Sequence, residues 1–388
     1  MAAELAFALI NPYSIAKSRT GGIIGRFMSR TGLELVAARM FGPSRELAQR
    51  YATQIRADKE KDETIRNILA DYILRAYAPD PRTGRRRRVL MLLFEGENAI
   101  EKIYKTAGPI RPNMEAGETV RDTFGDFITG EDGAVRYVEP AVLVGVTRDG
   151  ARATLRLWAE YSARDGGLVQ DAVDVAAQPE SQRTLVLIKP DNFRFPSARP
   201  GNIIDLFSRS GLRIVGAKVH RMSVAEAEQF YGPVREILRT KLNGVVAERA
   251  SRVLQKELGF DIPADLRKHL GEELGPFYGE QQFDEIVHFM TGGRPQQCTP
   301  QEKQAPGRER CLALVYAGAD AVARIRGILG PTDPSKAEPG SVRREFGQDV
   351  MVNAAHASDS AENAEREMKI VQVEQDLIAD WVRRYYPQ

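Results

Sequence analysis

The chain has 388 residues, of which 43% are hydrophobic and 28% are charged, and its formal net charge is +2. These values are typical of a globular protein and lack the basic excess of a dedicated nucleic-acid binder. With about 150 residues per domain as a guide, the length predicts two or three domains. The only cysteines, Cys298 and Cys311, cannot build a disulfide framework, so we expect a reducing, cytoplasmic setting.

The beginning of the chain predicts a strand rather than a signal peptide. The segment MAAELAFALINP (1–12) has neither a basic leader nor a small-residue cleavage site. No apolar run approaches the ~20 residues that cross a bilayer, so we expect no membrane association. The basic run RRRR (85–88) lies between a turn-like segment and a strand-like one, which favours an exposed loop.

Strands and helices alternate in the first half of the chain. LAFALINP (5–12) is strand-like, and GGIIGRFMSRTGLELVAARM (21–40) predicts a glycine-opened helix and a second strand. VLMLLFEGENAI (89–100) predicts a third strand, and GETVRDTFGDF (117–127) a polar segment before the last strand. Such alternation indicates an α/β (α+β) fold with helices packed on a sheet.

The same order of segments recurs in the second half, which indicates two tandem copies. The matching segments are TLVLIKPD (184–191), GNIIDLFSRSGLRIVGAKV (201–219), CLALVYAGADAV (311–322) and PGSVRREFGQD (339–349).

The repeat sets the expected domain limits. We expect domains at 1–161 and 183–388, joined by a linker at 162–182 that is rich in Gly, Asp, Ala and Gln. Apolar residues at near-helical spacing predict a helical insertion in the second copy at about 235–280. Packing on the second domain is its expected role, with a lid or a partner-docking role as the alternative.

One of the four histidines, His356, lies between the strand-like run QDVMVNAA and a charged, helix-like run. An imidazole has an ordinary pKa of ~6.5, so it is largely neutral at neutral pH and can carry a covalent phosphoryl group. Glu367, further along the helix, is spaced to hydrogen-bond the ring and fix its tautomer. The residues alone leave a satisfied structural histidine open as the alternative.

A Gly- and Pro-rich loop, GILGPTDPSKAEPGSVRREF (327–346), precedes this strand. It contains Thr332 and Arg343, and Arg326 comes just before it. Guanidinium groups match phosphate oxygens bidentately, so the segment has the groups to grip a polyphosphate. The sequence contains no G-x-x-x-x-G-K-[ST] motif, which excludes a P-loop site at the level of motifs.

The stretch GPTDPSKAEPGSVRREFGQDVMVNAAHASDSAENAERE (330–367) resembles the signature of nucleoside diphosphate kinases, in which N-x-x-H-G-S-D-S carries a phosphorylated histidine. The resemblance covers 183–371 apart from the insertion, and a weaker copy covers about 4–161. It implies two tandem ferredoxin-like β-α-β-β-α-β domains. It also implies ping-pong transfer of the γ-phosphoryl group of an NTP to an NDP through His356.

The resemblance further implies the site residues and partners. The catalytic set would be His356, Glu367, Ser358 and Tyr231, and the nucleotide-binding set Lys189, Arg326, Thr332, Arg343 and Asn353. Mg²⁺ would arrive on the nucleotide phosphates, without metal ligands from the protein. The partners would be NTP and NDP substrates in a homo-oligomer such as a trimer of pseudo-dimers.

Two features of the second half depart from the family pattern. Ala357 replaces the glycine after the histidine, and its Cβ would disturb a turn that needs positive φ. The aromatic residue that stacks on the base is either Phe277 or Phe283, since both lie in the remodelled region.

The first half departs much further. Asn11, Tyr104 and Ile110 stand where the resemblance places the lysine, the first arginine and the threonine, whereas Tyr51 and Arg121 match. This half contains no histidine, so we expect a degenerate domain that completes a pseudo-dimer by burying a sheet face. The alternative function for the whole chain is a catalytically weak or inactive nucleotide-binding scaffold or regulatory protein.

Overall fold

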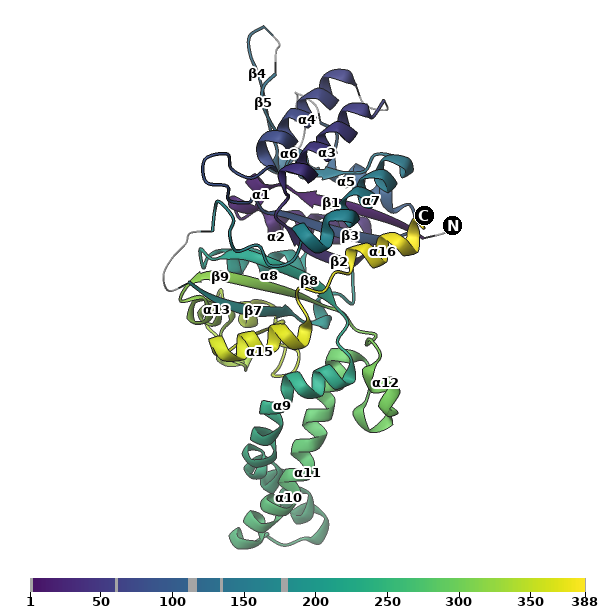
Figure 1. Ribbon diagram of the computed structural model, residues 1–388. Coiled ribbons are helices and arrows are strands. Elements are labelled where there is room, and N and C mark those ends of the chain that lie inside the picture. Colours follow the sequence, from purple (N-terminus) through teal and green to yellow (C-terminus); the bar gives the residue numbers. More distant parts are fainter. Residues whose placement is uncertain (1–2, 60–61, 111–116, 133–134, 176–180, 388) are drawn as a thin grey trace. The chain divides into compact units, whose positions relative to one another are not determined.

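The computed structural model describes residues 3–59, 62–110, 117–132, 135–175 and 181–387 (Figure 1). The chain divides into two compact units, one formed by Met1–His220 with Leu312–Gln388 and the other by Arg221–Cys311. The first unit contains both copies of the repeat, and the second consists of helices. Part of the expected linker, residues 176–180, lies outside the described residues.

The first copy is built on an antiparallel sheet with the strand order β2-β3-β1-β6. Its strands are β1 (Glu4–Ile10), β2 (Glu34–Phe41), β3 (Val89–Gly96) and β6 (Val142–Val144), with a separate hairpin of β4 (Asp126–Thr129) and β5 (Val135–Glu139). Its helices are α1 (Pro12–Ala16), α2 (Thr20–Thr31), α3 (Arg45–Ala57), α4 (Glu63–Ala76), α5 (Ala99–Ala107), α6 (Val120–Phe124) and α7 (Arg148–Asp165). β1 and β3 are apolar along nearly their whole length because the sheet is covered on both faces.

The second copy repeats this arrangement with the strand order β10-β7-β9-β8. Its strands are β7 (Ser181–Ile188), β8 (Arg213–His220), β9 (Cys311–Ala319) and β10 (Ala355–Ala357). Its helices are α8 (Arg199–Ser208), α13 (Ala321–Leu329), α14 (Val342–Phe346) and α15 (Ala361–Val371), with the 3-10 turns η1 (Pro190–Asn192) and η3 (Pro334–Lys336). A further helix, α16 (Ile378–Tyr385), follows this copy. The prediction of two tandem ferredoxin-like domains is confirmed.

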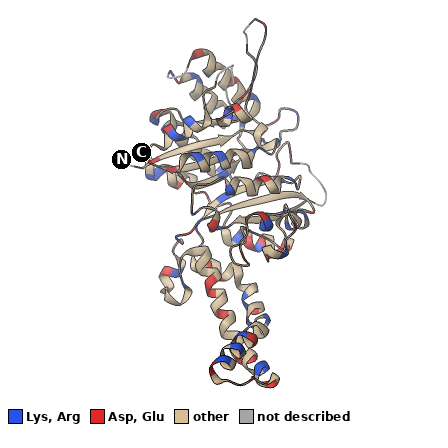
Figure 2. Ribbon diagram, turned by 180° about the vertical axis from the view of Figure 1, so that it is seen from behind, with Lys and Arg blue, Asp and Glu red and all other residues tan. Residues whose placement is uncertain are grey.

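The insertion is a helical unit of its own. It comprises α9 (Val224–Lys241), α10 (Asn243–Leu258), α11 (Ala264–Thr291), η2 (Pro295–Gln297) and α12 (Pro300–Gln304). A capping box of Ser223 and Glu226 starts α9, and Arg235 forms a bidentate ion pair with Glu280 on α11. Figure 2 shows basic and acidic residues interleaved along these helices, as expected for a solvated surface.

The two copies meet through one helix and one edge strand of each. Edge strands β2 and β8 lie side by side, and α2 packs on α8. A Cβ added at Gly201 would lie 2.6 Å from the Cα of Gly25, so only glycine allows this helix spacing. The expectation that a sheet face would be buried is therefore wrong, because the contact uses the sheet edges and these helices.

Segments following the last helix of each copy cross to the other copy. After α7, Val169 N donates to Val215 O of β8 at 2.8 Å. After α15, buried Arg39 of β2 donates to the carbonyl oxygens of Glu374 and Gln375 at 3.1 and 3.0 Å. Tyr386 OH then donates to Leu5 O at 3.0 Å, which ties the end of α16 to β1.

The basic run 85–88 is not the exposed loop that its composition suggested. Arg88 is only 2% exposed, pairs with Asp174 and donates to Ile214 O of β8. Arg86 pairs with Asp171 at 2.6 Å. These residues join the first copy to the segment that follows α7.

In the described part of the chain, no helix is both long enough and apolar enough to cross a bilayer.

Candidate active site

His356 lies in the middle of β10, where it is opposite Leu187 of β7. The preceding residue but one, Ala354, has a left-handed backbone with φ of 68°. Lys189 N donates to Ala354 O at 2.9 Å, so this bend is fixed to the end of β7. The histidine side chain is 22% exposed, which leaves it within reach of a ligand.

Glu367 and Ser358 hold the histidine ring. His356 Nε2 lies 2.9 Å from Glu367 Oε2, and Ser358 Oγ donates to the same oxygen at 2.6 Å. Glu367 comes from α15, which begins after the N-cap Ser360, and its side chain is only 5% exposed. A buried carboxylate that accepts from both groups fixes the orientation of the imidazole.

Lys189 and Asn353 form a second cluster. Lys189 Nζ donates to Asn353 Oδ1 at 2.7 Å and to Met351 O at 3.2 Å, while Asn353 Nδ2 donates to Thr332 O at 3.1 Å. Burial, with a smaller contribution from Arg343, lowers the pKa of Lys189 to about 8. Burial likewise raises the pKa of Asp191 to about 6. Charges held in this way suit a site that receives an anion.

Arg343 connects the loop to the histidine strand. It donates to Gly330 O at 3.1 Å and to Ala355 O, beside His356, at 3.2 Å. Arg326 on α13 and Thr332 in the following loop have exposed side chains. The structure thus gathers His356, Ser358 and Glu367 in one cluster, and Lys189, Asn353 and the main chain of Thr332 in another.

The remaining expectations concern the insertion and Ala357. Tyr231 lies buried on α9 of the helical unit, so its role beside His356 stays a prediction. Phe283 is buried and Phe277 is 76% exposed on α11. Ala357 is not among the described residues with positive φ, so the expected turn strain at this position is absent; Ala354 carries it instead.

Sequence reasoning missed Asn192 as a supporting residue. Its Nδ2 donates to Ala354 O at 2.8 Å and to Lys189 O at 3.1 Å, which holds the bend before the histidine. The signal was its place in the segment KPDN, three residues after the lysine.

The first copy has lost the equivalent chemistry. Ala141, which precedes the last strand and is left-handed, corresponds to Ala354. By this alignment Leu143, Gly145 and Thr154 occupy the positions of His356, Ser358 and Glu367. Arg121 keeps the structural bonds of Arg343, to Gly108 O and Val142 O, but it is buried.

A closed hydrogen-bond cluster replaces the lysine site of the first copy. Asn11 Nδ2 donates to Glu139 at 3.2 Å and Tyr77 OH donates to Asn11 Oδ1 at 2.6 Å. Tyr51 is also buried, and burial raises its pKa well above the ordinary value. The retained Tyr51 and Arg121 therefore serve the packing of this copy.

The fold and the gathering of a histidine, a carboxylate and phosphate-matching groups are consistent with a phosphotransferase. A family model described as nucleoside diphosphate kinase matches residues 4–132, 182–240 and 265–377, and the chain belongs to this family. Its activity is accordingly that of a nucleoside diphosphate kinase.

Relatives align with about half of the chain. The chain is 30% identical over 187 residues to a nucleoside diphosphate kinase of Campylobacter hominis, covering 48% of this chain and 92% of the relative. It is 33% identical over 183 residues to that of Chlamydia abortus, covering 47% and 86%. A crystal structure of the Aquifex aeolicus enzyme aligns at 28% identity and a TM-score of 0.30, covering 49% of this chain and 94% of that one.

Proposed function

We propose that the second copy transfers the γ-phosphoryl group of an NTP to an NDP by a ping-pong mechanism through His356. The contact of His356 Nε2 with Glu367 at 2.9 Å is the observation that carries the proposal. Glu367 accepts a hydrogen bond from Nε2–H and so favours the tautomer that is unprotonated at Nδ1. The Nδ1 lone pair then attacks the γ-phosphorus. The bond from phosphorus to the β,γ-bridging oxygen breaks, NDP leaves, and a second NDP takes the phosphoryl group from the histidine.

In this proposal the basic groups neutralise the phosphates. Lys189 and Asn353 meet the ribose hydroxyl groups and the terminal phosphate region, while Arg326, Thr332 and Arg343 hold the phosphate oxygens. In the described ranges no group of three His, Cys, Asp or Glu side chains is placed to hold a metal ion. Mg²⁺ would arrive bound to the nucleotide phosphates and neutralise part of their charge. The basic and amide groups of the protein would contact the nucleotide itself.

The test uses γ-labelled ATP with the wild-type chain, His356→Gln and the matched control His269→Gln, whose histidine is exposed in the helical unit. We expect acid-labile protein label in wild type and control only, and its transfer to added GDP. ATP binding without label in the wild-type chain would contradict the kinase mechanism and support the nucleotide-binding scaffold. The homo-oligomer, such as a trimer of pseudo-dimers, stays a prediction that sedimentation checks.

A further inference from the structure

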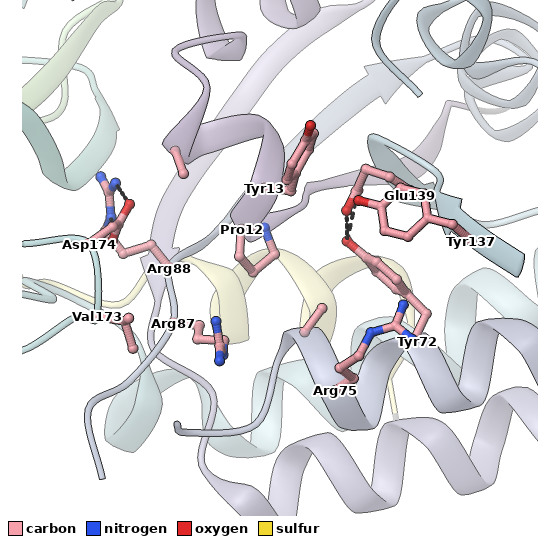
Figure 3. Close-up of a pocket in the computed structure, with 12 residues that line it drawn as sticks. Pro12, Tyr13, Tyr72, Arg75, Arg87, Arg88, Tyr137, Glu139, Val173 and Asp174 are labelled. Atoms are coloured by element: carbon pink, nitrogen blue, oxygen red, sulfur yellow. Dashed lines mark hydrogen bonds and ion pairs between the residues drawn. The ribbon is translucent and has the colours of Figure 1, made fainter. Parts of the chain in front are cut away.

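The first copy contains a cavity that the kinase reaction does not use. It has a volume of about 310 Å³ and is lined by residues of α1, α4 and β5, and by the segments around Arg87 and Asp174 (Figure 3). A separate cavity of about 370 Å³, lined by Tyr51, Gly145 and Thr154, marks the position of the lost active site. The two cavities share no lining residue, and the first is of a size that holds a small metabolite.

Two guanidinium groups in the wall of the first cavity have spare hydrogen-bonding capacity. Arg87 is half-buried; its Nε is buried without a hydrogen-bond partner, and its other contact is a 3.4 Å approach to Asp80. Arg75 is exposed and its guanidinium lies 5.9 Å from the ring centre of Tyr72. Since the Nε of Arg87 is buried, the terminal nitrogens of the two guanidinium groups are the atoms that can bind an anion such as phosphate.

The carboxyl groups in the same wall are already engaged. Asp174 pairs with Arg88, and Glu139 accepts from Tyr72 OH at 2.8 Å. Burial raises the pKa of Glu139, while its hydrogen bonds from Tyr72 and Asn11 act in the opposite direction. Outside the wall, Lys17 and Arg19 lie 5.6 and 5.4 Å from the ring centre of Tyr13. The lining contains three arginines and two carboxyl residues, so its formal charge is net positive.

Aromatic rings complete the lining. Tyr13 is half-exposed and Tyr137 is exposed, and Figure 3 shows both among the lining residues, with Tyr137 beside Glu139. Flat ligands stack on such rings with little dependence on their identity. We propose that this cavity binds a phosphorylated aromatic metabolite of the nucleoside phosphate class, with its phosphate on Arg75 and Arg87 and its ring against Tyr13 and Tyr137.

The experiment counts ADP molecules bound by the full chain, by calorimetry and equilibrium dialysis without ATP. We expect two per wild-type chain, one at the active site and one in the cavity. The double variant Arg75→Gln/Arg87→Gln is expected to keep one and to lose affinity for the other about tenfold or more. The control Arg82→Gln changes an exposed arginine on the same turn, outside the lining, and is expected to keep both.

Hydrogen exchange locates the second molecule, since ADP should protect residues 72–76 and 137–139. No ADP protection of residues 72–76 and 137–139 in the wild-type chain, or unchanged ADP affinities in the double variant, would overturn the proposal. Inorganic phosphate that binds the cavity as tightly as ADP would overturn the aromatic part. If the double variant fails to fold, Tyr13→Ala replaces it. The count does not involve His356, so failed phosphohistidine labelling would refute the kinase mechanism without affecting this proposal.

Discussion

The two copies of the repeat show which residues the fold needs and which the chemistry needs. Both retain a left-handed alanine before the last strand, Ala141 and Ala354, and an arginine that donates to two carbonyl oxygens, Arg121 and Arg343. Only the second copy has the histidine, serine and glutamate. The left-handed alanine and the arginine–carbonyl bonds kept in both copies therefore support the backbone, and we assign the phosphoryl transfer itself to the residues found only in the second copy.

The lysine position shows the same division. Lys189 is held beside Asn353 with a depressed pKa, whereas Asn11 is enclosed by Tyr77 and Glu139. The first copy has replaced the lysine by an amide that is part of a buried, hydrogen-bonded cluster. Such a cluster contributes to stability only when each buried group is satisfied.

The largest expected effect on activity is that of Glu367→Gln, apart from loss of the histidine itself. The amide lacks the negative charge of the carboxylate and can also donate to the ring from its NH₂ group, so the ring loses its tautomer preference, and we expect kcat to fall about a hundredfold. Steady-state kinetics measure the change, with Glu362→Gln on the exposed side of α15 as the control. Equal rates for the two variants would show that Glu367 is not needed to orient the histidine.

Gly201→Val tests the joint between the copies. The added Cβ would overlap the backbone of α2, so we expect a loss of about 2 kcal/mol in the free energy of unfolding. Gly327→Ala on α13 is the control, because nothing lies within 4 Å of its added Cβ. Chemical denaturation compares them. A Gly201→Val variant as stable as the control would mean that the two copies do not depend on this close approach.

The pH dependence tests the charge of Lys189. Because its folded pKa is lowered to about 8, we expect kcat/KM to fall up to about tenfold per pH unit above pH 8 as the cation is lost. The Lys189→Met variant should have a lower kcat/KM that does not change with pH in this range. The depressed pKa also means that the lysine costs stability at neutral pH. The stability contribution of this group rises from about pH 8 towards its unfolded pKa of about 10.5. A wild-type profile that is flat to pH 10 would contradict the assignment.

The smallest expected effect is that of restoring a histidine to the first copy. Leu143→His in a His356→Gln background should give no acid-labile label, because Gly145 and Thr154 supply no carboxylate and Arg121 is buried. Labelling with ATP checks this, with His356→Gln alone as the background. Label above that background would show that the first copy still binds and positions a nucleotide.

The sequence was sufficient where the pattern is local. The alternation of strands and helices follows from local patterns, the tandem repeat from the recurrence of those patterns, and the contact of His356 with Glu367 from residues 11 positions apart. The place of Ser358 beside Glu367 was implied by the family resemblance. Arg88 could not be placed in this way, because its partners Asp174 and Ile214 lie far along the sequence. The contacts of residues 374–386 with the first copy were likewise not predicted. The helical unit was predicted at about 235–280, but it extends over Arg221–Cys311. The left-handed conformation of Ala354 had no signal, since alanine rarely adopts it.

The crossing of residues 374–386 has a consequence for the order of biosynthesis. Arg39, Glu95 and Leu5 belong to the part of the chain that leaves the ribosome early, yet their partners Gln375, Tyr385 and Tyr386 are translated after the whole kinase copy. Domains generally fold as they emerge, with the earlier one first. Here the first copy lacks its contacts with residues 374–386 until the second copy has been translated. Nascent chains stalled before residue 374 should therefore engage chaperones more strongly than released ones.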